Sequence, residues 1–511
     1  MDSKVYYNNL SIINQINKSI TDPNIQKVLL ILGDIVSIPR PSKKEEHIRQ
    51  YIKKYIENVG GTVEIDNTGN LLGKFPASKG YENYNTVILQ AHMDIVCEQD
   101  KNKCPQINFM TDGVELQTKV KNGETWLCAN QTTLGADNGI GIAMALACLA
   151  QPSFNHPALE LLMTVDEETG LTGIKGIAAD WLKGKQLINL DSEEVDAFCV
   201  GCAGGQEGDI IMPLKRYKTE CFGIVDIEIS GLTGGHSGLD IDKNYTNAIS
   251  VLVELLDELN KSDVQIINFS GGSKRNAIPI HGKISCMATN FEILDKCKLV
   301  QDKMKTTVDP NLTINVNLDS DISTVQTKGA EVENISKECI DNLVKLVRAL
   351  PKGVIKMTSF NPNLVQTSNN IGFVRTAQDK LILGVCLRSC VTEDMHELIT
   401  SINNTAKQYN SVFEKLSGYP PWVPNTTTPL YQAAFNAFEQ LNGDKKPLMS
   451  CVHAGLECGF LTERYPNIEM ISIGPDIKAA HSPSECIKVS SIEPTYNLLV
   501  NIIEHITKLS N

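Results

Sequence analysis

The sequence predicts an α/β protein built on a mixed, mostly parallel sheet with helices on both faces, and an inserted α+β domain. Three observations lead to this prediction. Short apolar runs alternate with amphipathic helical stretches up to residue 190, a pattern typical of parallel sheets. From about residue 208 the pattern changes, and beyond residue 424 it returns. A chain of 511 residues is also too long for a single core.

The first part of the chain contains alternating helices and strands. Residues 44–59 carry a helical stripe, and a hairpin is expected between residues 63–65 and 71–75. The remaining elements expected here are strands at 86–90, 158–165 and 186–190, a helix at 140–150, and a helix through Ala178, Trp181 and Leu182. Ligands bind outside the carboxyl ends of parallel strands, so these ends are the place to look for a site.

The middle of the chain reads as an α+β insertion, with two ferredoxin-like halves as one interpretation. The expected strands are 224–229, 264–269 and 278–287, and the expected helices are 247–259 and 292–304. A similar alternation runs from Ile322 to about residue 413, with helices at 335–350 and 393–408. The proline-rich segment 419–424 (YPPWVP) cannot continue a helix and marks a boundary.

The domain boundaries follow from this change of pattern. We expect a catalytic domain formed by residues 1–206 and 420–511, interrupted by a lid and dimerisation domain at 207–419. The C-terminal part would add a helix at 430–441, a strand at 469–473 and a terminal helix at 494–508.

Composition and charge narrow the class of protein. The net charge of -13 argues against nucleic acid or an anionic membrane as partner. No secretory signal and no apolar run of about 20 residues is visible. The 15 cysteines are then expected to be reduced thiols of a cytoplasmic protein. The lone Cys199–Cys202 pair lacks the second pair that a zinc finger needs.

Three consecutive carboxylates, Asp166, Glu167 and Glu168, stand where the buried strand 158–165 should end. Adjacent carboxylates repel each other and are costly to bury. A solvated loop would explain the triplet alone. However, His92 and Asp191 stand at other strand ends of the same region, and Asp137 lies in a loop that opens a helix. His481, after the strand expected at 469–473, could reach the same sheet edge. The sequence therefore predicts a metal site with a catalytic carboxylate beside it.

The residue types fit this chemistry. Histidine and carboxylate ligands suit zinc, manganese or cobalt. One aspartate can bridge two ions, and a further carboxylate can take a proton from an activated water. Asp94 lies two residues after His92, on the same face of an extended chain, where it could hold the imidazole.

These segments resemble the family of dinuclear zinc peptidases that includes carnosinases and aminoacylases. The matching segments are HMD (92–94), GADNG (135–139), DEETG (166–170), LDSE (190–193) and AHSP (480–483). The aminoacyl-histidine dipeptidase subgroup (cytosolic non-specific dipeptidases, peptidase D type) is favoured by VGCAGG (200–205), GGHSG (234–238), NAIP (276–279) and HAGLECG (453–459).

The resemblance implies a role for each site residue. His92 and Asp191 would bind one divalent ion, Glu168 and His481 the other, and the Asp137 carboxylate would bridge them. The resemblance also implies a cis peptide bond between Asp137 and Asn138. Zinc is the expected metal, with manganese or cobalt as alternatives. Glu167 would be the general base and Asp94 would orient His92.

The inserted domain would complete the site. His236 resembles the histidine that stabilises the oxyanion, and Asn276 and Arg388 resemble residues that bind the substrate carboxylate. His453 and Gly455, in the HAGLECG segment, are placed with them as substrate-binding residues. The implied activity is hydrolysis of dipeptides, including Xaa-His, by an enzyme whose lid closes on short peptides. Members of this family are often homodimers through the lid, and a doubled lid within one chain is the alternative.

Other functions are compatible with parts of the sequence. A deacylase of N-acyl amino acids, a tripeptidase or a carboxypeptidase would share the ligands and differ in the lid pocket. An inactive binding protein predicts a broken ligand set, which the sequence does not show. The sequence lacks both the GxSxG motif of serine hydrolases and the HExxH motif of mononuclear metalloproteases. A cysteine hydrolase would be recognised by activity that a chelator does not inhibit.

Overall fold

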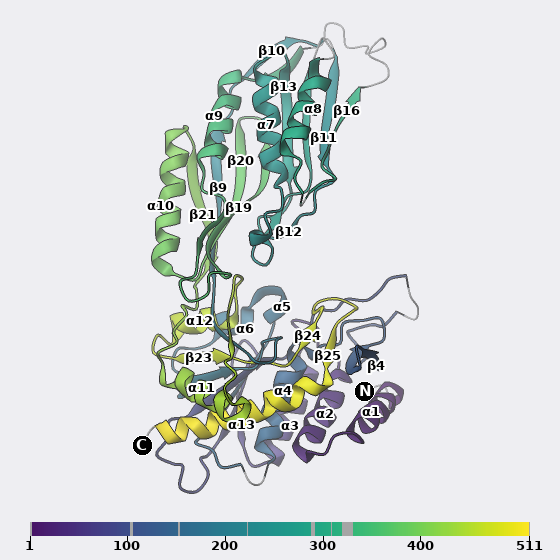
Figure 1. The fold of residues 1–511 in the computed structure, drawn as a ribbon, viewed down its shortest axis with the longest axis vertical. Helices are drawn as coiled ribbons and strands as arrows, with labels where there is room; N and C mark the ends of the chain where they lie inside the picture. Colours follow the sequence, from purple (N-terminus) through teal and green to yellow (C-terminus); the bar gives the residue numbers. More distant parts are fainter. Residues whose placement is uncertain are drawn as a thin grey trace. The chain divides into compact units, whose positions relative to one another are not determined.

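The computed structural model describes residues 3–102, 106–151, 154–221, 223–287, 292–307, 309–318 and 331–509. The chain divides into two compact units (Figure 1). Unit 1 comprises Met1–Gly201, Pro424–Cys451 and Leu456–Asn511, and unit 2 comprises Cys202–Val423 and Val452–Gly455. Each unit has its own large hydrophobic core.

Unit 1 is built around a mixed sheet. In spatial order its strands are β1 (Thr62–Ile65), β2 (Leu71–Phe75), β6 (Leu159–Thr164), β3 (Val87–His92), β7 (Gln186–Asn189), β23 (Glu469–Ser472), β8 (Ala197–Cys202) and β22 (Leu448–Val452). The central strands β6, β3, β7 and β23 run parallel, so their carboxyl ends share one edge. A smaller antiparallel sheet contains β24 (Ile477–Lys478), β25 (Cys486–Lys488), β5 (Glu124–Ala129) and β4 (Leu116–Lys121).

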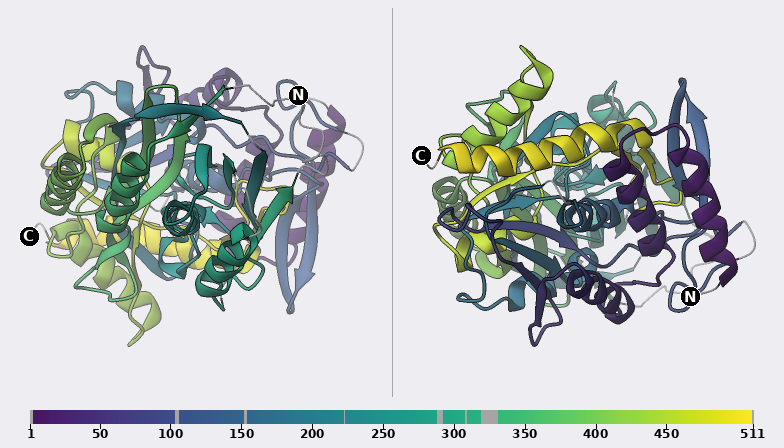
Figure 2. Two further views of the ribbon diagram at one scale, coloured as in Figure 1. Left: turned by 90° about the horizontal axis from the view of Figure 1, so that it is seen from above. Right: turned by 90° about the horizontal axis from the view of Figure 1, so that it is seen from below.

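Helices pack around this sheet, and six of them contribute to its apolar core: α1 (Ser3–Asn17), α2 (Pro23–Val36), α3 (Glu46–Asn58), α4 (Ala136–Leu149), α11 (Pro429–Asn442) and α13 (Ile492–Leu509). The shorter helices are α5 (Glu167–Gly170), α6 (Thr172–Gly176) and α12 (Glu457–Arg464). Figure 2 shows α13 (yellow) beside the N-terminal helices (purple), and α13 contacts α2. The small residues of α4 let it pack closely on β3, which fixes the start of α4 at the sheet edge.

Unit 2 is an antiparallel sheet with helices packed on it. In spatial order the strands are β16 (Thr313–Leu318), β11 (Ile224–Ser230), β15 (Gly282–Met287), β13 (Gln265–Gly272), β19 (Val365–Thr376), β20 (Lys380–Ser389), β9 (Gly204–Pro213) and β21 (Val412–Tyr419), with β18 (Gly353–Met357) beside β19. The helices are α7 (Ala248–Asn260), α8 (Glu292–Met304), α9 (Lys337–Ala349) and α10 (Thr392–Gln408), and all four contribute to the core. Two short ribbons pair β10 (Arg216–Glu220) with β17 (Glu331–Ile335) and β12 (Gly235–His236) with β14 (Ala277–Ile278).

The predicted fold class is confirmed, and one predicted element is wrong. The helix expected through Ala178, Trp181 and Leu182 is absent, because α6 ends at Gly176 and an irregular segment follows. Backbone N–H groups of this segment bind side chains instead of a helical ladder. The Glu160 carboxylate accepts from the backbone N–H groups of residues 183 and 184, and the Tyr465 hydroxyl accepts from that of Leu182.

One further difference concerns the extent of a strand. The strand expected at 278–287 is divided into β14 and β15 around Pro279, which cannot donate to a ladder. The expected start of the second alternation at Ile322 lies outside the described residues. In the parts of the chain that the structure describes, no helix is both long and apolar enough to cross a bilayer.

Candidate active site

The predicted ligands of unit 1 lie together because three parallel strands end side by side. His92 is the last residue of β3 and pairs with Thr164, the last residue of β6. Asp191 follows β7 by two residues, and Glu167 and Glu168 begin α5, just after β6. The register therefore brings the acidic and histidine side chains to one edge of the sheet, as the sequence predicted.

Asp137 lies between the two histidines. Its Oδ1 is 2.9 Å from His92 Nε2, and its Oδ2 is 3.0 Å from His481 Nε2. The peptide bond from Asp137 to Asn138 is cis, as the resemblance implied. A carboxylate whose two oxygens each face a different imidazole has the donor arrangement of a bridging metal ligand.

The remaining ligands complete two groups that share Asp137. Asp191 Oδ1 is 3.4 Å from His92 Nε2, and Glu168 Oε2 is 3.0 Å from His481 Nε2. The ligand atoms of His92, Asp137 and Asp191 lie within 4.8 Å of one another, as do those of Asp137, Glu168 and His481. The other oxygen of Glu168 is buried without a hydrogen-bond partner among the described residues. This orphaned oxygen and the hard donor set fit two divalent cations.

Glu167 is close enough to join this site as well. One of its oxygens forms a third group with ligand atoms of His92 and Glu168. Burial raises the pKa of Glu167 well above its ordinary value of 4.5, while His92 lowers it and the Asp191 carboxylate raises it. The geometry alone leaves Glu167 either as a ligand or as a base.

Asp94 connects His92 to the acidic triplet. Its Oδ1 is 3.5 Å from His92 Nδ1 and accepts the backbone N–H of Glu167 at 3.0 Å. Its Oδ2 accepts the N–H of Glu168 at 3.1 Å and the Ser42 hydroxyl at 2.7 Å. The buried Asp94 carboxylate thus holds both the His92 imidazole and the first backbone N–H groups of α5 in position.

The first acid of the triplet, Asp166, has a structural role that the sequence did not reveal. Asp166 adopts a left-handed backbone conformation with φ of 52°. Its buried carboxylate accepts hydrogen bonds from the hydroxyl groups of Thr169 and Thr172. These bonds close the sharp turn that separates the strand from Glu167 and Glu168.

Two buried charged residues around the site were missed by sequence reasoning. Arg40 donates hydrogen bonds to the carbonyl oxygens of Met93, Asp94 and Gly135. Glu485 accepts the backbone N–H groups of residues 134, 135 and 137, with the first at 2.7 Å. Glu485 lies four residues after His481, and this short spacing is the feature of the sequence that could have indicated its place near the site. Both residues fix the loop that carries Asp137.

A third missed residue, Glu457, lies under the strand ends. Its Oε2 accepts hydrogen bonds from Gln90 Nε2 at 2.5 Å and from the Thr164 hydroxyl at 2.7 Å. Gln90 in turn bonds Asn189, so one buried network joins β3, β6 and β7. Burial raises the pKa of Glu457 to about 8. The residue belongs to the HAGLECG segment that the sequence had singled out.

The predicted residues of unit 2 form a separate polar cluster. His236 and Asn276 are brought together by the β12–β14 ribbon, where the Ser237 N–H donates to the Asn276 carbonyl at 2.9 Å. The Nδ1 of His236 accepts the N–H groups of Gly238 and Leu239, each at 3.2 Å. The ring proton of neutral His236 is therefore on Nε2. Burial and the charge of Arg388 both lower the pKa of His236.

Arg388 and His453 are the buried members of this cluster. Arg388 is 4% exposed, and its Nη1 donates to the Tyr419 hydroxyl at 2.7 Å. Its Nε is buried and has no hydrogen-bond partner in the described parts of the chain. His453 Nε2 lies 2.7 Å from the Ser368 hydroxyl. Burial, and after it the charge of Arg388, lowers the pKa of His453 to about 3, so this imidazole is neutral.

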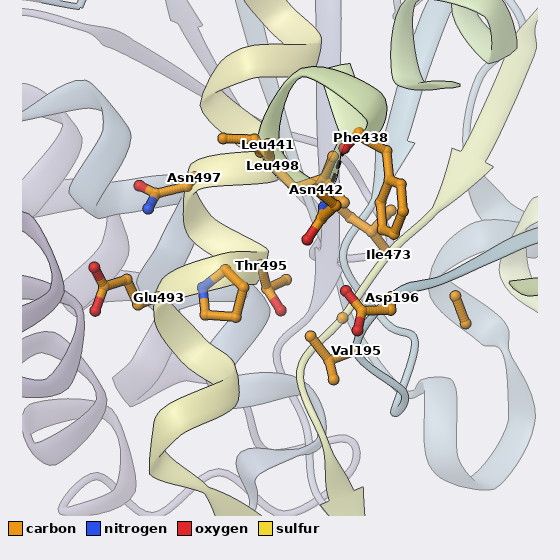
Figure 3. A pocket seen from close by; sticks show the side chains of 13 residues that line it. Val195, Asp196, Phe438, Leu441, Asn442, Ile473, Glu493, Thr495, Asn497 and Leu498 are labelled. Carbon is orange, nitrogen blue, oxygen red and sulfur yellow. Dashed lines mark hydrogen bonds between the residues drawn. The ribbon is translucent and has the colours of Figure 1, made fainter. Parts of the chain in front are cut away.

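Unit 1 also contains a pocket away from the predicted site residues (Figure 3). Its volume is about 260 Å³, and its lining includes Asp196, Phe438 and Thr495. None of the predicted site residues lines it. The candidate chemistry is therefore at the sheet edge and in the Arg388 cluster. Cys199 and Cys202 are buried, reduced cysteines of β8.

A mostly parallel α/β unit with paired histidine–carboxylate groups at its strand ends, joined to an inserted α+β unit, defines the class of metal-dependent peptidases and related hydrolases. The comparison with known families agrees with this class. The family model described as Peptidase family M20/M25/M40 matches residues 88–505. The chain belongs to this family, and the predicted resemblance is confirmed.

Relatives of known structure or curated name support the same assignment. The chain is 34% identical over 484 residues to the cytosol non-specific dipeptidase of Escherichia coli, covering 93% of this chain and 96% of that protein. The crystal structure of aminoacylhistidine dipeptidase from Vibrio alginolyticus matches with a TM-score of 0.81 at 31% identity, covering 95% of this chain and 97% of that one. Aminopeptidase PepT from Bacillus cereus shares the fold, with a TM-score of 0.54, 17% identity and coverage of 94% and 98%.

Proposed function

We propose that this chain is a metallo-dipeptidase that hydrolyses the peptide bond of dipeptides, including Xaa-His substrates. The single observation that supports this most strongly is the pair of histidine–carboxylate groups that share Asp137. The similarity over nearly the whole chain to the E. coli dipeptidase and to the Vibrio aminoacylhistidine dipeptidase supports the choice of substrate.

The ligand set proposed for two divalent ions is His92 and Asp191 for one, Glu168 and His481 for the other, and Asp137 for both. Zinc is the proposed metal, and manganese or cobalt would also suit these donors. When bound, such ions polarise a carbonyl and lower the pKa of water. Asp94 would keep His92 in the required orientation through its contact with Nδ1.

Glu167 is the proposed general base. Its carboxylate is held beside the ligands, while its backbone is fixed by Asp94. It would take a proton from the attacking water and later donate that proton to the leaving amine.

The unit 2 residues are proposed to bind the rest of the substrate. His236 carries its proton on Nε2 and could donate it to the oxygen that gains charge during attack. Arg388, with Asn276, would bind the C-terminal carboxylate, because a buried guanidinium offers a bidentate fork. His453 and Gly455 lie in the same cluster and would shape this subsite.

The test compares substrates and metals on one preparation. Ala-His, β-Ala-His, N-acetyl-alanine and Ala-Ala-Ala are offered to the zinc-loaded protein, to chelated protein and to protein reloaded with manganese or cobalt. We expect the two dipeptides to be cleaved, activity to be lost with the chelator, and metal analysis to return two ions per chain. Preference for the acetylated or tripeptide substrate would replace the dipeptidase assignment, and activity that survives chelation would refute the metal site.

Location and assembly are proposed on similarity alone. We place the enzyme in the cytoplasm, as the curated name of the E. coli relative indicates for that protein. A homodimer through unit 2 is proposed from the sequence resemblance. Light scattering of the wild type measures the mass directly, and a monomer at micromolar concentration would refute the dimer.

A further inference from the structure

Tyr419, Gly205 and Arg388 form a single row across three neighbouring strands of unit 2. In β9 and β21, Gly205 pairs with Tyr419, and in β9 and β20 the same Gly205 pairs with Arg388. Residues directly opposite each other in a sheet project to the same face. The side chains of Tyr419 and Arg388 therefore stand on one face, two strands apart, with a glycine between them.

The glycine is what allows these two side chains to meet. Adjacent strands are about 4.8 Å apart, so Tyr419 and Arg388 start about 10 Å apart. Because Gly205 has no side chain, the tyrosine ring can lie over it. A Cβ at Gly205 would stand 2.5 Å from the ring, and a Cβ at Gly455 would stand 2.7 Å from it. The ring is therefore held between two glycines, one in β9 and one in the HAGLECG segment.

The Tyr419 hydroxyl accepts a hydrogen bond from one particular nitrogen of Arg388. It accepts from Nη1 at 2.7 Å, while Nε is buried and has no partner in the described chain. A guanidinium binds a carboxylate with two parallel hydrogen bonds along one edge. With Nη1 engaged, the edge formed by Nε and Nη2 is left for a ligand. No carboxylate of the described residues is within ion-pair distance of Arg388, so this cation has no charge partner of its own.

We propose that Tyr419 is a positioning residue that turns the Nε–Nη2 edge of Arg388 toward the substrate's C-terminal carboxylate and so sets the selectivity for unblocked dipeptides. This inference rests on the proposed dipeptidase function. It also gives a physical reason for two glycines of the sequence: Gly205 and Gly455 make room for the ring that aligns the arginine.

The test measures selectivity for the carboxylate rather than activity alone. Kinetic constants are determined for Ala-His and for Ala-His amide, which lacks the terminal charge, with wild type and Tyr419→Phe. We expect Tyr419→Phe to raise the KM for Ala-His about tenfold, to change kcat less than threefold, and to leave the KM for the amide unchanged. Gly205→Ala, which displaces the ring, should lower the preference for Ala-His in the same way. Tyr431→Phe is the matched control, because its hydroxyl contacts Met449 in unit 1, and it should leave both KM values unchanged.

A double-mutant comparison separates positioning from simple structural support. In the Arg388→Met background, Tyr419→Phe should have no further effect on the ratio of the two substrates, because the tyrosine acts only through the arginine. A Tyr419→Phe variant that is less stable but keeps the wild-type ratio of KM values would overturn the inference while leaving the dipeptidase function intact. If wild type cleaves neither substrate, the proposed function fails, and this inference fails with it.

Discussion

The two charged clusters of this protein are built in opposite ways. In unit 1, histidines and carboxylates contact one another. The two carboxylate oxygens of Asp137 lie 2.9 Å from His92 Nε2 and 3.0 Å from His481 Nε2. In unit 2, the buried Arg388 has a tyrosine hydroxyl as its partner and no carboxylate of the described residues within ion-pair distance. The first cluster has an excess of anionic ligands, and the second has an unpaired cation.

This difference indicates what each cluster lacks. Carboxylates held together repel one another unless a cation joins them, so we expect metal ions to complete the unit 1 cluster. A buried guanidinium without a counter-ion is costly, so we expect an anion to complete the unit 2 cluster. A dipeptide with a free carboxylate would supply that anion. The predictions below test this complementarity, from the largest effect to the smallest.

The largest effect is expected from Glu167→Ala. Loss of the general base should reduce kcat by about 1000-fold or more, because general base catalysis contributes roughly 100- to 10,000-fold. Metal content should stay at two ions per chain, since the ligands are unchanged. Glu168→Ala is the matched neighbour and should lose metal as well as activity. If Glu167→Ala also loses metal, Glu167 is a ligand, and the division of roles within the triplet is wrong.

The second effect concerns the unpaired cation. Arg388→Met keeps much of the side-chain volume and removes the charge, so kcat/KM for Ala-His should fall about 100-fold. The free energy of unfolding should stay the same or rise, because an uncompensated buried charge is lost. Arg375→Met changes an exposed arginine of the same unit and should alter neither quantity. A strong loss of stability in Arg388→Met would show that the cation has a stabilising charge partner, contrary to the comparison.

More of the unit 1 cluster than of the unit 2 cluster could be predicted from the sequence, for a physical reason. Strand ends are visible as apolar runs followed by His92, Asp191 or the acidic triplet, and parallel strands bring such ends together. The fold class followed from the same pattern. The choice between ligand and base for Glu167 did not, because both roles use the same side chain.

The residues that sequence reasoning missed act through long-range contacts. Arg40, Glu457 and Glu485 are buried ionisable residues whose partners lie far away in the chain, such as Gln90 for Glu457. The sequence shows Tyr419 only as part of a proline-rich boundary, because its contact with Arg388 depends on the register of three strands. Neither kind of contact leaves a local pattern. The helix expected through Trp181 failed similarly, since distant side chains such as Glu160 take its backbone donors.

The third prediction compares the stability of the two units with and without bound metal. At a free zinc concentration of 100 times Kd, each bound ion should add about 2.7 kcal/mol to the stability of the unit that binds it. Hydrogen exchange of chelated and zinc-loaded protein should therefore show slower exchange for β3, α5 and the start of α4 when zinc is present. Peptides from α7 and α9 in unit 2 serve as the internal control and should be unchanged. Equal protection of both units would contradict the assignment of the ligands to unit 1 alone.

The smallest effect is a pH dependence in unit 2. Burial and the charge of Arg388 lower the pKa of His453 to about 3, from an ordinary value of 6.5. Below pH 6.5 the unfolded chain therefore binds a proton that the folded chain does not, so the stability that neutral His453 contributes is present above pH 6.5 and is lost as the pH falls toward 3. Urea unfolding at pH 7.0, 6.0 and 5.5 should show wild type losing at most about 1.4 kcal/mol per pH unit relative to His453→Gln. In the Arg388→Met background the same difference should shrink, because part of the cause is removed. A slope that is unaffected by Arg388→Met would mean that burial alone keeps His453 neutral, and the cation would then have no influence on its own neighbours.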